Sequence, residues 1–266
     1  MRNILLTALL MVLFVLPSLA QNINVTPAQL NFFLEGGEST TTELVLKNTG
    51  NVVETFNLSI GDWKMKPNGD AETLPPNSTK NSCSEWFSLS ESLVKLAPNQ
   101  SKKVKVTIKV PNGKVGTNWS MIYVGRSEEQ VKLSGADKAL QLGAEVTTQV
   151  GIPVFQSTRT GGNYKAKVLS LKEIAKKKAN RQFRAELSNQ GNTVFEGKVF
   201  VTFSNIKTGQ EIENPVHKLT VLPNSSRFFD FIIPSTLPKG DYTMAVVLDY
   251  NEDAELEGKQ AQLSIK

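Results

Sequence analysis

Few residues in this chain have the chemistry that catalysis requires. The sequence contains one histidine, His217, and one cysteine, Cys83. One residue of each type does not complete the four-ligand shell of a structural zinc ion. A Ser-His-Asp triad around His217 would need a positioned nucleophile, and the sequence has no Gly-x-Ser-x-Gly turn to present one. We therefore expect a protein without enzymatic activity and without a cofactor.

An acidic segment near the C-terminus is the best candidate for a metal site. Asp249, Asn251 and Asp253 place oxygen atoms at alternate positions, as the start of a calcium-binding loop does. However, Ala254 stands where the sharp turn of such a loop requires glycine, and its twelfth position holds Gln260 instead of glutamate. The pattern favours an acidic hairpin tip, so we expect no metal ion there.

The aromatic residues allow two interpretations, a carbohydrate-binding platform or core packing. Trp63, Trp86 and Trp119 each lie on or beside an expected strand, which favours core packing for at least two of them. We take Trp86, Trp119 and Tyr123 as candidate surface contacts. Trp86 is expected to be the most exposed, because it borders an irregular segment rich in proline and asparagine.

The first 20 residues predict a cleaved secretory leader. Arg2 provides the positive charge, Ile4–Val15 the apolar centre, and Ser18-Leu19-Ala20 the small-residue cleavage site. The apolar centre is shorter than the run of about 20 residues that a membrane-spanning helix needs. We therefore expect a protein without a membrane span, located in the periplasm, secreted or at the cell surface.

Composition sets limits on cross-links and on partners. With Cys83 alone, an intrachain disulfide is excluded; we expect a partly covered thiol in a loop, with intermolecular pairing as the alternative. The net charge of +5 is modest and spread along the chain, and aromatic and basic residues do not interleave. Nucleic acid is therefore not an expected partner.

A set of turn sequences occurs twice along the chain and indicates the β-strands that would position any site. The offsets between the two copies are 141, 125 and 124 residues, so the first copy holds an insertion of about 16 residues. The repeated landmarks are Asn48-Thr49-Gly50-Asn51 with Asn189-Gln190-Gly191-Asn192, Ala97–Ser101 with Leu222–Ser226, and Gly116 with Gly240. Two related β units in tandem explain this pattern.

Short strands separated by Gly, Pro and Asn fill both copies, which is typical of β-sandwiches. We expect an all-β chain of two Ig-like antiparallel sandwiches, at residues 21–156 and 163–266, with a polar linker at 157–162. Residues 119–124 are apolar on both faces, which suits a central covered strand or an interaction surface. A short helical turn is expected near Ser90 to Lys95.

Two irregular segments occur only in the first copy. The insertion lies between residues 65 and 85, and a polar, charged loop covers residues 125–143. Long loops in compact domains are often functional, although disordered surface decoration is the simpler interpretation of both.

The turns carry a resemblance to a known family. Asn-x-Gly-Asn after a strand, then Leu-x-Pro-Asn-x-Ser, then proline and glycine before a tyrosine strand, resemble exported bacterial Ig-like modules. These include the two-domain PapD-like periplasmic pilus chaperones. The resemblance covers most of residues 22–266, and the residues that carry it build turns.

The resemblance implies a donor strand at the end of the first domain, which completes the sheet of a client protein. An apolar row at period two fits this role, and Pro153 near its end requires a free strand edge. The row consists of Val146, Thr148, Val150, Ile152 and Val154. The same alternation also fits a closing strand whose apolar row faces its own core.

The chain departs from the chaperone pattern in its basic residues. Phe32 and Phe33 stand on the early strand where the family has an arginine, and no lysine interrupts residues 146–155. The family's anchoring of a client's terminal carboxylate is therefore in doubt for this chain.

Two functions follow from these features. The first is a periplasmic chaperone or assembly factor for pilus-like surface structures, which binds other exported or envelope proteins by sheet-edge pairing. The alternative is a structural or adhesive envelope module that binds glycan, cell wall or another envelope protein, and uses the two irregular segments of the first copy.

Overall fold

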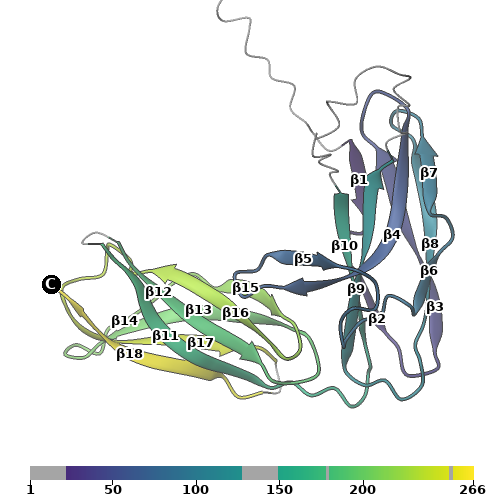
Figure 1. The fold of residues 1–266 in the computed structure, drawn as a ribbon. Helices are drawn as coiled ribbons and strands as arrows, with labels where there is room; N and C mark the ends of the chain where they lie inside the picture. The colour runs from purple at the N-terminus through teal and green to yellow at the C-terminus, as the bar shows by residue number, and fades with distance from the viewer. Residues whose placement is uncertain (1–21, 128–148, 178–179, 252–253) are drawn as a thin grey trace, which may run out of the picture.

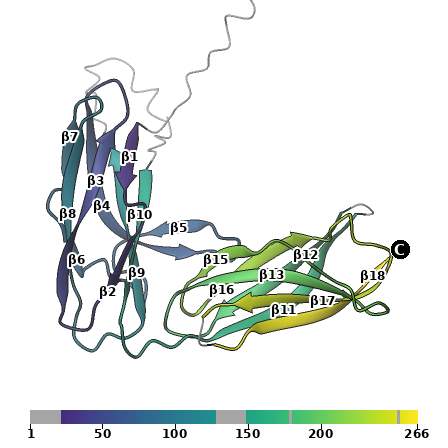
Figure 2. The ribbon, with the colours of Figure 1, turned by 180° about the vertical axis from the view of Figure 1, so that it is seen from behind.

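The computed structural model describes residues 22–127, 149–177, 180–251 and 254–266. The expected leader, most of the 125–143 loop, Val146, Thr148 and Asp253 lie outside these ranges. Every element within them is a β-strand, and the strands form two sandwiches (Figures 1 and 2), so the all-β prediction is confirmed. Among the described residues, no helix is long and apolar enough to cross a membrane.

The first sandwich packs a four-stranded sheet against a six-stranded one. The smaller sheet has the order β1 (Ile23–Thr26), β3 (Ser39–Asn48), β8 (Ser101–Lys109), β6 (Phe87–Leu89). The larger sheet has the order β2 (Leu30–Phe33), β10 (Gln149–Ser157), β9 (Thr117–Arg126), β4 (Glu54–Met65), β5 (Ala71–Leu74), and β7 (Leu93–Leu96) also pairs with β4. Leu44, Ile108 and Ile122 lie in the core between them.

The second sandwich repeats this plan with fewer strands. One sheet has the order β11 (Ala166–Lys177), β12 (Asn180–Asn189), β16 (Ser225–Ile232). The other has the order β14 (Glu211–Glu213), β13 (Phe195–Asn205), β17 (Gly240–Asp249), β18 (Glu257–Ile265), and β15 (His217–Val221) pairs with β13. Phe203, Leu187 and Tyr242 are among the buried side chains of its core.

The predicted alternation is seen in β8 and explained by burial on one face. Val104, Val106 and Ile108 are fully buried, whereas Lys105 and Thr107 between them are exposed. Strand β9 is buried on both faces along nearly its whole length, as its continuous apolar run predicts. The helical turn expected near Ser90 to Lys95 is wrong, because these residues lead into β7, which pairs with β4.

The repeated turn sequence produces the same hydrogen bonds in both sandwiches. The buried carboxamide of Asn48 donates to two carbonyl groups and accepts one backbone N–H, and Asn189 does the same. The partners are Val52, Leu96 and Gly50 in the first sandwich, and Thr193, Val221 and Gly191 in the second. Because each asparagine ties its turn to a neighbouring strand, the residue type is fixed by its partners.

The insertion expected over residues 65–85 is an ordered extension of the sheet. Strand β4 continues to Met65, turns at residues 66–70 and returns as β5. The resulting β4–β5 hairpin leaves the body of the first sandwich and extends toward the second (Figure 1). The simpler interpretation as disordered surface decoration is therefore wrong for this segment.

A buried carboxylate at the base of the hairpin holds the following loop. Asp62 is fully buried, and its Oδ2 accepts the backbone N–H groups of Ser78 (2.9 Å) and Thr79 (3.0 Å). Its Oδ1 accepts the hydroxyl groups of Ser82 (2.7 Å) and Ser120 (3.2 Å). These bonds take the place of the hydration that the carboxylate loses on burial. They also fix residues 78–82 against strand β9.

The hairpin tip touches the second sandwich. The backbone N–H of Phe228 donates to the carbonyl oxygen of Pro67 (2.7 Å), and Arg227 donates to the sulfur of Met65 (2.6 Å). A second contact lies near the chain crossing, where Thr117 bonds to Asn192 through their backbones (2.8 Å). The sandwiches are therefore joined at two places and meet at an angle (Figures 1 and 2).

Candidate strand-pairing site

Strand β10 is paired along its whole length on one side and only partly on the other. Its residues from Gln149 to Ser157 pair antiparallel with β9 without a register shift. On the opposite side β2 pairs only with Val154–Ser157, in parallel. Among the described residues, no strand pairs with the second edge of residues 149–153.

The open half of the edge results from the path of the preceding chain. Strand β1 pairs with β3 in the smaller sheet, whereas β2 pairs with β10 in the larger sheet. The chain therefore changes sheets between Thr26 and Leu30, and Leu30 lies opposite Val154. Because the chain reaches β10 only at that position, the earlier residues of β10 keep an open edge.

The direction of the backbone groups follows from the bonds at the C-terminal end of β10. The carbonyl oxygen of Ser157 accepts from Leu34 on the β2 side, and the N–H of Thr158 donates to Gly116 on the β9 side. Since successive residues of a strand bond to opposite sides, the odd-numbered residues direct their groups to the β2 side. Gln149 and Gly151 thus face the open edge. Pro153 faces the same side, where its carbonyl serves the parallel pairing of Val154 with Leu30 and it has no N–H to leave unpaired.

The predicted donor-strand residues fall into three groups. Ile152 and Val154 are buried in the core of their own sandwich, and Val150 packs against that core while partly exposed. Val146 and Thr148 lie outside the described residues. The inner row of the described part of β10 is thus largely occupied by its own sandwich. Its use by a client stays a prediction.

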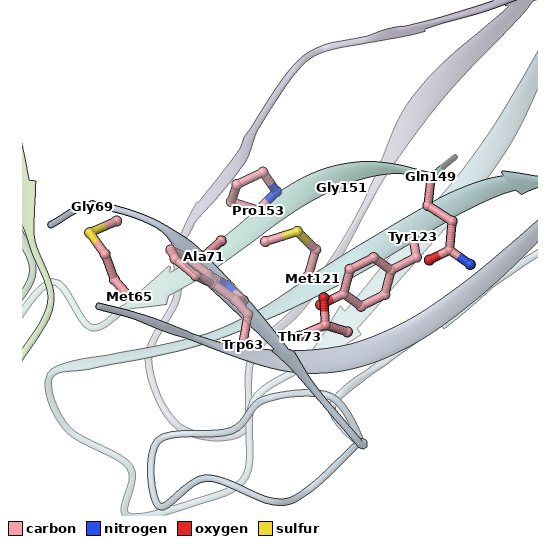
Figure 3. Close-up of a pocket in the computed structure, with 10 residues that line it drawn as sticks. All are labelled: Trp63, Met65, Gly69, Ala71, Thr73, Met121, Tyr123, Gln149, Gly151 and Pro153. Carbon is pink, nitrogen blue, oxygen red and sulfur yellow. The ribbon is translucent and has the colours of Figure 1, made fainter. Parts of the chain in front are cut away.

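The outer face of β10 borders a cavity of about 610 Å³. The floor is formed by β9, one side by β10 and the opposite side by the β4–β5 hairpin (Figure 3). The lining residues are Trp63, Met65, Gly69, Ala71 and Thr73 of the hairpin, Met121 and Tyr123 of β9, and Gln149, Gly151 and Pro153 of β10. The cavity therefore lies directly beside the open edge.

The polar atoms of the aromatic walls are bonded away from the cavity. The indole N–H of Trp63 donates to the carbonyl of Ser120 (3.1 Å), and the hydroxyl of Tyr123 donates to the backbone carbonyl of Asp62 (3.1 Å). Both rings therefore offer mainly carbon atoms to the interior, and Met65 and Met121 add flexible thioether side chains.

Two of the three expected surface aromatics need correction. Trp119 and Tyr123 are only 6% and 8% exposed, because the hairpin folds back over the outer face of β9. Trp119 also donates its indole N–H to the carbonyl of Trp63 (3.0 Å). Trp86 is half-buried, with the ammonium group of Lys114 5.5 Å from the ring centre. Core packing is confirmed for Trp63 and Trp119.

A cation without an acidic partner among the described residues lies at the end of the cavity. Arg227 contacts Met65 and Gly69 of the hairpin and donates to the carbonyl of Thr220 (3.1 Å). Desolvation by burial lowers the pKa of this guanidinium below its usual range. This contact links the hairpin to the second sandwich, and the guanidinium loses part of its hydration in forming it.

The remaining candidate residues form no catalytic set. Cys83 lies in a loop as expected but is fully buried rather than partly covered, and burial raises the pKa of its thiol to about 12. Intermolecular pairing is therefore not supported. His217 is exposed beside Phe229, with ring centres 5.4 Å apart. Asp249 lies 3.5 Å from Lys198, and no metal-binding group of side chains occurs among the described residues.

Asp62 and the hairpin that it supports were not predicted from the sequence. The available signal was an acid beside a tryptophan within a strand, followed by a segment rich in Ser and Thr. A buried acid needs several donors, so this combination predicts a loop folded around a carboxylate. Periodicity alone does not reveal it.

Comparisons with known proteins add a likeness of fold. No family model matches the sequence, and no curated protein matches it. The class 5 fimbriae chaperone CfaA is 12% identical with a TM-score of 0.47, covering 91% of this chain and 98% of that one. The E. coli chaperone DraB is also 12% identical, with a TM-score of 0.41 and the same coverage of both chains.

A third structure is a CsuC-CsuE chaperone-tip adhesion subunit complex from the archaic chaperone-usher Csu pili of Acinetobacter baumannii. The matched chain is 13% identical, with a TM-score of 0.46, covering 90% of this chain and 98% of that one. The predicted resemblance to pilus chaperones thus reappears among solved structures. At these identities it concerns the fold alone.

Proposed function

We propose that this chain is an exported, non-enzymatic protein-binding module that pairs the open edge of β10 with a strand of a client protein. The observation that supports it is the unpaired edge of residues 149–153. Unpaired backbone groups on a strand edge are a template for another strand, and peptide recognition by strand addition uses them. A periplasmic chaperone or assembly factor for pilus-like surface structures is the role that fits this mode.

The edge offers a defined set of bonds. Gln149 and Gly151 supply an N–H and a carbonyl each, whereas the carbonyl of Pro153 is already used by the parallel pairing of Val154 with Leu30. A client strand would therefore gain up to four backbone hydrogen bonds here, each contributing about 0.5–1.5 kcal/mol net. The expected binding is moderate in strength, as suits a partner that must be released.

One pair of variants separates backbone pairing from side-chain contact. Gln149→Pro removes the N–H that faces the open edge, whereas Gln149→Ala removes the same side chain and keeps the N–H. The chain after the expected leader would be used to recover partners from a cell-envelope extract. Their affinity for both variants would then be measured by surface plasmon resonance.

We expect Gln149→Pro to weaken client binding about 2- to 12-fold relative to Gln149→Ala, the equivalent of one net hydrogen bond. Equal affinities for the two variants would count against edge pairing. Recovery of glycan or wall material, with no protein client, would favour the structural or adhesive envelope module instead.

A further inference from the structure

We propose that the cavity beneath the β4–β5 hairpin accepts an apolar side chain from the client strand that pairs with β10. The inference rests on the proposed function, because it assigns the cavity to the same client. The occupant is an extended polypeptide segment whose residue opposite Gly151 is leucine, methionine or phenylalanine. The cavity would thereby select among strands that the backbone edge alone does not distinguish.

Strand geometry brings this side chain to the cavity. Gln149, Gly151 and Pro153 line the cavity with their outer face, and Gln149 and Gly151 direct their backbone groups to the open edge. A residue that pairs directly opposite one of them has its side chain on the same face, about 5 Å away. Any strand added to β10 therefore presents alternate side chains to the cavity side.

Gly151 makes the approach open. It is exposed, and a Cβ atom at this position would collide with the sulfur of Met121. Met121 thus lies against the backbone of the edge strand, and no β10 side chain separates it from the position of an incoming residue. Glycine inside a strand often marks such a close approach.

The chemistry of the walls favours an apolar and flexible guest. Trp63 and Tyr123 have their polar atoms bonded elsewhere, and Met65 and Met121 adapt their shape to what they contact. A volume of about 610 Å³ is ample for the largest apolar side chain and lies in the range of ligand sites. None of the ten lining residues carries a charge, so a charged guest beside Gly151 would lose hydration without an ion pair at these walls.

The proposed strand would continue an interface that already exists in the protein. Strand β2 occupies the same edge of β10 from Val154 onward, with Leu30 at its first position. A client strand beside residues 149–153 would lie end to end with β2 and extend the same row of strands. The sheet would then be complete along the whole of β10.

Methionine methyl groups provide a direct readout. After the expected leader the chain has three methionines, Met65 and Met121 at the cavity and Met244 in the second core. The probes are nine-residue peptides of alternating threonine and valine with lysines at both ends, which differ only in a central glycine, leucine, methionine or phenylalanine. Binding would be followed by NMR on protein labelled with 13C at methionine methyls and with 15N at backbone amides.

We expect every peptide to shift the amides of Gln149 and Gly151. The leucine, methionine and phenylalanine peptides should also shift the Met65 and Met121 methyls, leave Met244 unchanged, and bind about 10- to 100-fold more tightly than the glycine peptide. Thr73→Trp, which fills the cavity, should reduce their affinity to that of the glycine peptide. Glu72→Trp, on the opposite face of β5, is the matched control and should leave it unchanged.

The outcomes separate the two proposals. If the amides shift, all peptides bind with equal affinity and the Met65 and Met121 methyl signals do not move, the cavity assignment is overturned and edge pairing stays intact. Absence of amide shifts with every peptide at millimolar concentration would overturn both. Loss of binding in Glu72→Trp as well as Thr73→Trp would also overturn the cavity assignment, since the effect would then come from the hairpin as a whole.

Discussion

Replacement of Asp62 tests whether one buried carboxylate holds the loop behind the hairpin. Its two oxygens accept five hydrogen bonds from four residues, and the side chain is fully buried. Removal of the shared acceptor leaves several donors unpaired at about 1–3 kcal/mol each, so a total cost of about 3–5 kcal/mol is expected. We expect Asp62→Ala to lower the free energy of unfolding by about this amount.

Asp62→Asn should cost about half as much, because the amide keeps one acceptor and turns an NH2 group toward the remaining donors. Urea denaturation would give both values, and hydrogen exchange at the amides of Ser78 and Thr79 would locate the change. Asp70→Ala is the matched control: Asp70 is exposed in the same hairpin, and its loss should change stability by about 0.5 kcal/mol or less.

If Asp62→Ala lowered the free energy of unfolding by less than about 1 kcal/mol and both amides kept their protection, the carboxylate would not be what holds the loop. If Asp62→Ala does not fold, Asp62→Asn supplies the comparison on its own.

Two further predictions concern the thiol and the sandwich junction. Burial raises the pKa of the Cys83 thiol from 9.0 to about 12. As the pH rises, the thiol therefore ionises in the unfolded chain before it ionises in the folded protein. Stability should therefore fall between pH 9 and pH 12 relative to Cys83→Ala, and parallel urea midpoints would contradict this. Gly116 has φ +84 and lies against the carbonyl of Asn192, so Gly116→Ala should cost more than about 1 kcal/mol and speed proteolysis between the sandwiches. Unchanged cleavage would argue against a strained contact there.

The turns of this fold were predictable because their bonds are local. Asn48 and Asn189 bond within four residues and to one neighbouring strand, so the same short sequence recurs wherever the same geometry does. Asn99 and Asn224 likewise share a left-handed backbone, with φ of 61 and 54. A repeat of such residues therefore identifies a repeated fold without any information on the core.

The environment of β9 was not predictable in the same way. A continuous apolar run indicates that both faces of a strand are covered, but it does not say by what. In this chain the outer face is covered partly by the protein's own hairpin, which packs Trp63 against Trp119 and Phe155. That cover depends on the bend of β4 and on Asp62, which are tertiary features. Tyr123 therefore looked like a surface contact and is a cavity wall.

The two closing strands show how the copies diverged. β18 is an edge strand that carries Glu257 and Lys259, and Arg181 donates to the carbonyl of Ser264 near its end (3.1 Å). Charged residues of this kind protect natural sheet edges from other strands. From Gln149 to Ser157, β10 has no charged residue at all.

An uncharged open edge exposes a protein to pairing with unrelated strands unless the edge has a use. Pro153 limits what can pair there because it has no N–H, whereas Gly151 leaves the approach to Met121 open. The hairpin of the first copy forms the side of the cavity opposite this stretch of β10. The hairpin and the cavity, which the second copy lacks, thus lie beside an open edge without charges, which is why we place the client there.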